Sequence, residues 1–520
     1  MSSRLRSILF CAPLGLMLAG SVPALAASRE PVCDVLHYGA TGKGVALDSP
    51  AINAAIADCS AKGGGRVVLK RGTYRSGTIR LQSNVTLDLK SGSKILGSSN
   101  LADYSHMSSK SEWRDTPLLV AENVHDIAII GKGTIDGNGR AFVDPAGPHW
   151  KPSFDVSLTR QGNAWAARMA QSNEGPFSML LRPGVLFVAL HVDGLVLRDF
   201  HVVDTPNWGI KVGCSKFVDV HHIDVRSNVF IPNDDALEIS SSQYVNVSDS
   251  CLEAGDDALV IGGPCTDGWC QDKAEHITVH DMTLVSRSAA IRVGPSAKGI
   301  SDAHFYRIKI KDSNRGILLQ TRDDETPEDV TFEQMHIQTR LIDGPWWGGG
   351  EPIAISVAHG DYVSWTPTTQ LGFLRNIRFS DIVIDTESPV VIYSTQPGHI
   401  QNLSFKNVFI TMHVGPLTSV LGGNLDLQPT TPEIGVRAQD LPAILVHQVD
   451  GLSFTNLTVN WKGTFPTFYT NALFAEGFNG LTVDNFHGSA AQSNLPAIHL
   501  GLGTGAQLTD IHNPDGSLSK

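Results

Sequence analysis

Short runs of alternating apolar and polar residues recur along most of the chain. One set of runs begins at residues 208, 236, 258, 290, 316 and 353, so successive starts lie 22–37 residues apart. A second set alternates with the first and includes the runs that begin at residues 195, 217, 244 and 276. Period-two alternation predicts strands, and the Asn, Asp and Gly residues between the runs predict tight turns. Repeats of this length indicate a solenoid or a propeller. Each repeat holds two or three very short strands rather than the four of a propeller blade, so the sequence predicts an all-β parallel β-helix.

A different pattern precedes the repeats. Ser49 and Pro50 are followed by apolar residues at helical spacing up to Cys59, which predicts one amphipathic helix with an N-cap and a proline at its first position. We expect residues 27–80 to form an N-terminal helical cap and residues 81–520 to form the β-helix. The repeat is interrupted at about residues 140–176, where Trp150 and Trp165 lie, and this interruption predicts a long functional loop.

The first residues have the features of a secretory signal. Arg4 and Arg6 precede an apolar run, and small residues follow it up to Ala26. The apolar run is too short to span a membrane. We therefore expect residues 1–26 to be a signal peptide that is cleaved near Ala26, and the mature protein to be periplasmic or secreted.

Export changes the interpretation of the cysteines. The chain after Ala26 retains Cys33, Cys59, Cys214, Cys251, Cys265 and Cys270. An even number of cysteines in an oxidising compartment permits disulfides. Cys33 and Cys59 could crosslink the cap, and the last two are close neighbours in a loop. The middle two could instead be small buried apolar residues. Because no CxxC pair or His-rich cluster accompanies them, no metal site and no cofactor are expected.

Composition and charge exclude several classes of protein. Hydrophobic residues make up 42% of the chain and charged residues 18%, which is sufficient for a core and unlike a disordered protein. The net charge of −12 comes with no basic run, so no nucleic-acid partner is expected. No apolar stretch long enough to span a membrane follows the first thirty residues. Capped solenoids of this kind are expected to be monomers.

Stacking allows the runs that begin at residues 236, 258, 290 and 316 to be aligned. The alignment predicts two inward apolar columns, Leu237/Leu259/Ile291/Ile317 and Ile239/Ile261/Val293/Leu319. It also predicts two outward columns, Glu238/Val260/Arg292/Leu318 and Ser240/Gly262/Gly294/Gln320. Directly before the first two runs lie Asp234-Asp235 and Asp256-Asp257. Two neighbouring coils are therefore expected to place four carboxylates at one corner of the β-helix.

Four carboxylates stacked at one corner indicate a catalytic site. A single aspartate at such a corner often only caps a turn. Two pairs at equivalent positions repel each other, and this repulsion gives an enzyme one carboxyl with a raised pKa beside ionised partners. Glycoside hydrolysis uses such an arrangement, in which one carboxyl protonates the leaving oxygen and another activates water. The alignment does not fix the separation that distinguishes inverting from retaining enzymes.

At these residues the chain resembles glycoside hydrolase family 28, the polygalacturonase family. The motifs run from YGATGKGVALDSPAINAAI through GTIDGNG and LRP to PNDDALEI and GDDALVI. The resemblance implies a right-handed parallel β-helix with Asp256 as the general acid. Asp235 and Asp257 would hold the water that inverts the anomeric centre, and Asn233 and Asp234 would contact the substrate.

The chain also departs from the family pattern. Where the family has Gly-His-Gly, this chain has Arg287-Ser288-Ala289-Ala290, and the family's Arg-Ile-Lys clamp falls on Leu318-Leu319-Gln320. These departures point away from a plain endo-polygalacturonase. The WWGGGEP segment from Trp346 to Pro352 resembles divergent bacterial members. The resemblance implies action on pectic side structures or rhamnogalacturonan, or release of terminal sugars.

Other residues are candidates for the missing contacts with substrate. Arg292 lies in the column of the family's clamp arginine, one coil earlier, and could bind a substrate carboxylate with Arg315 or Arg322, because guanidinium pairs with carboxylate in a bidentate manner. The alternative is a solvent-exposed arginine. Gln320 occupies the position of the clamp lysine. Trp346 and Trp347 could stack on a sugar face or only fill a loop.

The sequence thus predicts a secreted inverting glycoside hydrolase that acts on pectin-type polysaccharide or oligosaccharide, either galacturonan or rhamnogalacturonan. Its partner would be an acidic plant cell-wall polysaccharide, with no nucleic acid and no membrane. Two alternatives stay open. One is a polysaccharide lyase or epimerase on the same fold, with calcium bound by the clustered carboxylates, and the other is a non-catalytic carbohydrate-binding β-helix.

Overall fold

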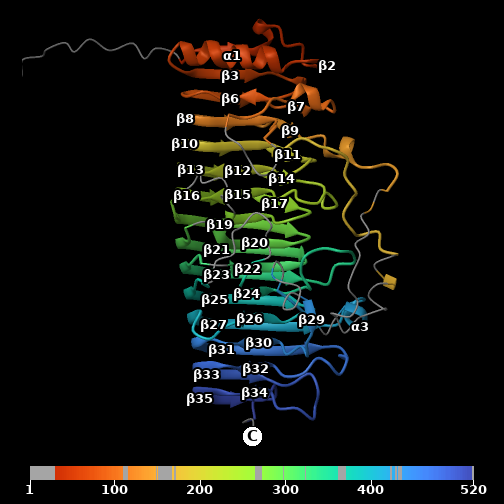
Figure 1. The fold of residues 1–520 in the computed structure, drawn as a ribbon, viewed down its shortest axis with the longest axis vertical. Helices are drawn as coiled ribbons and strands as arrows, with labels where there is room; N and C mark the ends of the chain where they lie inside the picture. Colours follow the sequence, from red (N-terminus) through yellow and green to blue (C-terminus); the bar gives the residue numbers. More distant parts are fainter. Residues whose placement is uncertain are drawn as a thin grey trace, which may run out of the picture.

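The protein is an elongated stack of coils (Figure 1). The computed structural model describes residues 30–108, 115–147, 149, 167–168, 171–263, 272–296, 298–322, 324–360, 370–421, 424–427, 430 and 436–517. Within these residues, parallel pairing joins nearly all strands into one sheet of 33 strands that winds along the whole stack. The expected all-β parallel β-helix is therefore confirmed. The predicted signal peptide, Trp150, Trp165, Cys265 and Cys270 lie outside the described residues.

Two long ladders of strands form most of the solenoid. The first ladder consists of β12 (Ile210–Gly213), β15 (Leu237–Ser240), β18 (Leu259–Gly263), β20 (Ala289–Ser296), β22 (Arg315–Arg322), β24 (Ile353–Ala358), β26 (Val390–Ser394), β30 (Ile444–His447), β32 (Leu473–Glu476) and β34 (Ile498–Leu500). The second consists of β13 (Lys216–His221), β16 (Gln243–Ser248), β19 (Ala274–Ser286), β21 (Ile300–Ser313), β23 (Pro327–Thr339), β25 (Leu374–Thr386), β27 (Ile400–His413), β31 (Asp450–Lys462), β33 (Phe478–Gly488) and β35 (Gly503–His512).

Shorter ladders complete the first coils. Strands β1 (Val32–Asp34), β3 (Gly65–Leu69) and β6 (Val85–Leu89) lead into β8 (Leu119–Ile130), which pairs with β10 (Phe187–Arg198). Strands β2 (Lys43–Leu47), β4 (Gly72–Ser76), β7 (Ser93–Gly97), β9 (Thr134–Asp136), β11 (His201–Val203), β14 (Asp224–Arg226) and β17 (Cys251–Ala254) form another ladder, and β5 (Ile79–Arg80) pairs with β8. A separate antiparallel pair, β28 (Asn424–Asp426) and β29 (Val436–Ala438), follows the short helix α3 (Thr418–Leu421).

Stacked side chains fill the interior. Five phenylalanine rings in successive coils lie face to face with centroids 4.7–5.1 Å apart, at Phe305, Phe332, Phe379, Phe405 and Phe454. This spacing matches the distance between neighbouring strands, so each ring lies directly above the next. The rings are fully buried or nearly so, and the core is continuous from coil to coil.

The predicted columns agree with the pairing of the strands, with one exception. Leu237 faces Leu259, then Ile291 and Ile317, and the predicted outward column from Glu238 to Leu318 is also in register. The column through Gly262 and Gly294 is not, because the pairing shifts after Ile261 so that Gly263 faces Ser296. The outward column is also covered rather than solvated, since Glu238 and Val260 are fully buried.

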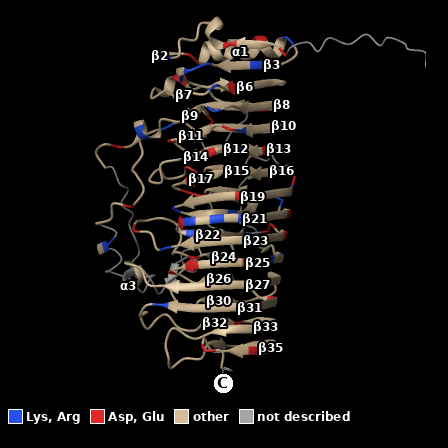
Figure 2. Cartoon of the chain, turned by 180° about the vertical axis from the view of Figure 1, so that it is seen from behind, with Lys and Arg blue, Asp and Glu red and all other residues tan. Residues whose placement is uncertain are grey.

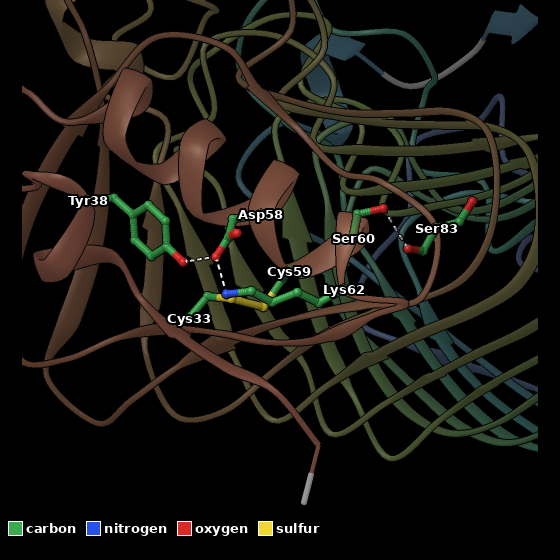
Figure 3. Close-up of a disulfide and its surroundings, with 7 residues drawn as sticks. All are labelled: Cys33, Tyr38, Asp58, Cys59, Ser60, Lys62 and Ser83. Atoms are coloured by element: carbon green, nitrogen blue, oxygen red, sulfur yellow. Dashed lines mark hydrogen bonds and ion pairs between the residues drawn. A yellow bond between two sulfur atoms is a disulfide. The ribbon is translucent and has the colours of Figure 1, made fainter. Parts of the chain in front are cut away.

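The N-terminal helix covers the first coil. Helix α1 (Ser49–Ala61) follows the prediction, although its N-cap is Asp48 rather than Ser49. A disulfide joins Cys33 in β1 to Cys59 in α1, and Asp58 beside it contacts Tyr38 and Lys62 (Figure 3). The possible crosslink in the cap is therefore confirmed. Cys214 is disulfide-bonded as well, whereas Cys251 is a half-buried free cysteine.

We expect removal of the cap disulfide to lower the stability of the amino-terminal coils. The bond closes a loop with a sequence separation of 26 residues, and a crosslink of this span stabilises a fold by about 3 kcal/mol, mainly through the unfolded chain. The variant with both Cys33→Ser and Cys59→Ser should unfold at a lower temperature when followed by circular dichroism. Cys251→Ser removes a thiol without breaking a bond and is the control. Equal melting of the double variant and the unaltered protein would contradict this prediction.

Within the described residues, no helix is long and apolar enough to cross a membrane, and no group of three or more His, Cys, Asp and Glu side chains has the geometry of a metal site.

Candidate active site

The four aspartates lie together at one corner of the solenoid, as the alignment predicted. The residues before β15 and those before β18 occupy equivalent positions in successive coils, and the amide of Ala236 donates to the carbonyl of Asp257 at 3.0 Å. The side chains of Asp235, Asp256 and Asp257 are close enough for their charges to interact, and all three are buried. The corner therefore brings three carboxyl groups from two coils into one cluster.

Arg292 reaches this cluster from the next coil. Its Nε lies 3.0 Å from Asp257 Oδ2, and its Nη2 lies 3.8 Å from Asp235 Oδ2. The side chain of Arg292 is 17% exposed, so it is not the solvent-exposed arginine of the alternative interpretation. One guanidinium thus lies against two of the three carboxylates, and it still has a face toward solvent.

Burial and mutual repulsion control the protonation of the cluster. Desolvation raises the pKa of Asp235 well above its usual range, and the neighbouring charges of Asp256 and Asp257 raise it further. Desolvation and the charge of Asp257 raise the pKa of Asp256 in the same way, while Arg292 lowers both pKa values. A cluster of this kind can hold a proton at a pH where an ordinary aspartate has lost it.

Asp234 and Asn233 support Asp256 from the preceding coil. Asp234 is fully buried and accepts hydrogen bonds from the amides of Gly255 and Asp256 at 2.7 and 2.9 Å. Burial raises the pKa of Asp234 to about 7. Its side chain is directed into the protein, so the expectation that Asp234 binds substrate is corrected: it positions the backbone of Asp256. The half-buried Asn233 donates to Asp256 Oδ2 at 3.4 Å, so it contacts the cluster directly.

A lysine in the coil above was missed by the sequence analysis. Lys211 in β12 faces Glu238 in β15, and their charged groups lie 3.2 Å apart. The ammonium group also lies 4.7 Å from the ring centroid of Trp208. The alignment of the runs contained the signal, since the run at residue 208 extends the outward column by one coil to Lys211. The charges of Glu238 and Arg292 both act on Asp235, so this column influences the cluster from both sides.

Three of the predicted substrate-binding residues are buried and have partners inside the solenoid. The guanidinium of Arg315 donates to Glu351 at 3.2 Å, and that of Arg322 donates to Ser356 and to the carbonyl of Leu427. Gln320 is also buried. Because these side chains lie inside the protein, the expectation that they contact substrate is corrected. The two arginines instead join loops to the coils.

The two tryptophans of the WWGGGEP segment differ in their surroundings. Trp346 is buried, and its indole N–H donates to the carbonyl of Glu174 at 2.6 Å. Trp347 is 45% exposed, and its carbonyl accepts a hydrogen bond of 2.7 Å from Asn314. Asn314 occupies the position of Asp256 two coils further along. The exposed indole is therefore carried by the same corner of the solenoid as the carboxyl cluster, and only Trp346 fills a loop.

An insertion between β9 and β10, which we call the arm, packs against the same segment. Its described residues are 139–147, 149, 167–168 and 171–182. Ser172 donates to the carbonyl of Asp343 at 3.0 Å, and Arg168 forms an ion pair with the Asp343 carboxylate at 2.6 Å. The arm lies along one edge of the stack, at the right in Figure 1 and at the left in the opposite view of Figure 2. It joins the coils above the cluster to the tryptophan segment below it.

Comparison with known proteins relates this site to pectin-degrading enzymes. The family described as "Glycosyl hydrolases family 28" matches residues 59–267, a region that includes Asp235, Asp256 and Asp257. The exo-poly-alpha-D-galacturonosidase of Dickeya chrysanthemi is 30% identical over 251 residues, which are 44% of this chain and 41% of that protein. A probable polygalacturonase of Vitis vinifera is 22% identical and covers 56% of this chain and 57% of its own length. The chain thus spans about half the length of these curated relatives.

Solved structures share the fold. An exopolygalacturonase from Thermotoga maritima has a TM-score of 0.60 at 18% identity and covers 83% of this chain and 92% of its own. A family 28 exopolygalacturonase from Yersinia enterocolitica has a TM-score of 0.56 at 16% identity and covers 93% and 78%. The two structures agree with the parallel β-helix. The motifs and the fold agree with the match of residues 59–267 to glycosyl hydrolases family 28.

Proposed function

We propose that this chain is a secreted inverting glycoside hydrolase that cleaves pectin-type polysaccharide or its oligosaccharides. The observation that carries the proposal is the buried cluster of Asp235, Asp256 and Asp257 with Arg292 against it. The names of the relatives, which are polygalacturonases and an exo-poly-alpha-D-galacturonosidase, support a galacturonan-containing substrate.

The cluster suits a reaction in which two carboxyl groups have opposite tasks. Asp256, whose pKa is raised by burial and by Asp257, keeps a proton and donates it to the glycosidic oxygen as the bond breaks. Asp257 lies 3.0 Å from the guanidinium of Arg292, and with Asp235 it accepts a proton from the water that attacks the anomeric carbon. The proton that leaves the water balances the one given to the leaving oxygen, so the cluster ends the cycle in its original total charge.

The charged and polar side chains at the corner indicate the class of substrate. Among the described residues, Arg292 is the cation that lies against the cluster, and it is shared with two carboxylates, so a uronate bound there would compete with them. Leu318 and the buried Gln320 stand where a uronate clamp is expected. We therefore propose a mixed pectic chain such as rhamnogalacturonan, or the end of a galacturonan chain, in preference to the interior of unbranched galacturonan.

Product analysis tests the proposal. The protein is incubated with galacturonan and rhamnogalacturonan oligosaccharides, and the products are identified by mass and by the anomeric proton signals in early NMR spectra. We expect saturated products with inverted configuration. Retained configuration would contradict the mechanism. Unsaturated products that absorb ultraviolet light, with activity lost in EDTA and restored by calcium, would favour a lyase, and binding without products would favour the non-catalytic alternative.

Secretion is tested separately. If residues 1–26 direct export, the exported protein should begin at Ala27 or Ser28, as determined by mass spectrometry of its amino-terminal peptide. An exported protein that retains Arg4 and Arg6 would contradict cleavage.

We expect Trp347→Ala to weaken substrate binding more than turnover. An exposed indole held by a hydrogen-bonded backbone can stack on a sugar ring, and such contacts contribute about 0.5–1.5 kcal/mol, which corresponds to roughly a twofold to tenfold rise in KM. Steady-state kinetics with rhamnogalacturonan oligosaccharides measures this change, and kcat should stay close to that of the unaltered protein. Phe409→Ala, at another exposed aromatic residue, is the control. An unchanged KM would remove Trp347 from the binding site.

A further inference from the structure

A second corner of the solenoid, at the start of the second ladder, has a regular backbone feature. In each coil one residue adopts a left-handed conformation, with φ between 51° and 81°. The strand pairing places these residues above one another. They are Asp126, Gly194, Phe217, Tyr244, His276, Asp302, Asp329, Asn376, Asn402, Gly451, Gly480 and Gly505.

Two successive coils depart from the residue preference of this corner. Gly, Asn, Asp and His tolerate the left-handed conformation, and the other coils, including that of His276, use them there. Phe217 and Tyr244 do not follow this preference, and a bulky side chain in this conformation is strained. Tyr244 and His276 follow β15 and β18, the strands that come directly after Asp235 and Asp257. Strained aromatic residues in neighbouring coils indicate a task for their side chains.

The three rings form one exposed strip. Phe217 and Tyr244 stack with centroids 5.2 Å apart and an angle of 13° between their planes, and Tyr244 and His276 stack at 4.8 Å and 20°. Phe217 is 59% exposed and Tyr244 is 50% exposed. The strip follows the order of β13, β16 and β19, which lie one below the other (Figure 1). We call these three residues the aromatic strip.

The upper end of the strip has an uncovered ring face. The equivalent residue in the coil above Phe217 is Gly194, which has no side chain to place on the ring. One coil higher lies Asp126, whose side chain is 74% exposed. Two coil spacings, about 9.6 Å, separate the backbone positions of Phe217 and Asp126. The Asp126 side chain enters this interval, because its Oδ1 lies 3.0 Å from the place of a Cβ at Gly194, and its Oδ2 lies 3.0 Å from His125 Nδ1. A ring bound above Phe217 would therefore meet the Asp126 carboxylate.

We propose that the aromatic strip is a carbohydrate-binding site outside the catalytic corner, in which a neutral pyranose ring stacks on Phe217 over Gly194 and its hydroxyls donate to Asp126. The apolar face of a pyranose suits an aromatic ring, and the exposed carboxylate suits hydroxyl donors. Asp126 and Asp193 are both exposed near the gap, beside the exposed Lys216 and the exposed His125 that contacts Asp126. This balance disfavours a uronate and favours a neutral sugar. The proposal goes beyond the hydrolase function and depends on it only for the class of polymer.

The alternative is that the rings only stabilise one another. Replacement by asparagine separates the two possibilities, because Asn376 and Asn402 show that this corner accepts asparagine. Phe217→Asn removes the platform and relieves the strained backbone, so the variant should fold and should melt at the same temperature as the unaltered protein or higher. A purely stabilising strip predicts the opposite change in melting temperature.

Affinity electrophoresis in gels that contain a polymer tests the proposal. The background is Asp256→Asn, so that turnover does not consume the polymer, and the polymers are a neutral galactan and polygalacturonate. We expect galactan to retard the Asp256→Asn protein, and Phe217→Asn to weaken this binding at least about fivefold. Tyr244→Asn should have a smaller effect, because its ring faces are covered by its neighbours. Phe409→Asn is the matched control at an exposed aromatic residue in another coil.

Three results would overturn the proposal. These are equal retardation of Phe217→Asn and its parent, retardation by polygalacturonate alone, and equal loss in the Phe409→Asn control. Galactan binding does not require catalysis, so a failure of the hydrolase proposal, seen as absence of products, remains distinguishable from a failure of this one.

Discussion

Asp256→Asn should lower kcat by about a hundredfold to ten-thousandfold, which is the usual contribution of a general acid. The amide keeps the shape of the side chain and the contact with Asn233, but it has no acidic proton for the glycosidic oxygen. Removing this carboxyl also removes a charge that raises the pKa of Asp235, so Asp235 should ionise at lower pH. The measurement is kcat on pectic oligosaccharides over a range of pH.

A substrate with an acidic leaving group provides the sharper test. An aryl glycoside needs little protonation of its leaving oxygen, so Asp256→Asn should lose much less activity on such a substrate than on an oligosaccharide. Asp510→Asn in the last coil, where the left-handed backbone suits asparagine, is the control and should be fully active. Equal loss on both substrates would remove Asp256 from the role of general acid.

Arg292→Gln should lower kcat/KM by about tenfold to a hundredfold near neutral pH and move the acidic limb of the pH profile upward. The guanidinium lowers the pKa values of Asp235 and Asp256, so its removal raises both. The base must be ionised, and with a higher pKa it reaches that state only at higher pH. Activity should therefore be lost first on the acidic side. The magnitude is that of a lost contact between charged groups, about 1.5–3 kcal/mol.

Two comparisons, one of side-chain charge and one of substrate charge, distinguish two possible roles of Arg292. Arg292→Lys keeps the positive charge and should move the acidic limb less than Arg292→Gln does. If the arginine tunes the cluster, neutral and charged oligosaccharides should lose activity equally. A loss confined to charged substrates, with an unchanged pH profile, would instead assign Arg292 to the binding of a substrate carboxylate.

The sequence alone predicted both the β-helix and the carboxyl cluster, because the alignment of the inward apolar residues determines both. Leu237, Leu259 and Ile291 must face the interior together, and once they are aligned the aspartates that precede the strands are aligned as well. Period-two alternation also placed Arg292 in the correct column. It did not give the direction of its side chain, which depends on the buried charges around it.

Long-range contacts account for what the sequence did not reveal. Arg322 is buried because its guanidinium meets a carbonyl 105 residues away, at Leu427. Trp346 is buried because the arm brings Glu174 against it, 172 residues earlier in the chain. Neither contact has a periodic signal, since both join loops that lie outside the repeat. The interruption at residues 140–176 showed that a long loop exists, but its docking partner could only be read from the structure.

The stacked phenylalanines of the core limit how such a protein can change over time. Each ring from Phe305 to Phe454 rests on the ring of the adjacent turn, so an insertion that changes the face of one of these residues would remove its ring from the stack. Whole turns can be added to the interior without this loss. Loops that leave the stack at its corners are not limited in this way. New substrate specificities should therefore arise by exchange of these loops, while the stacked core stays unchanged.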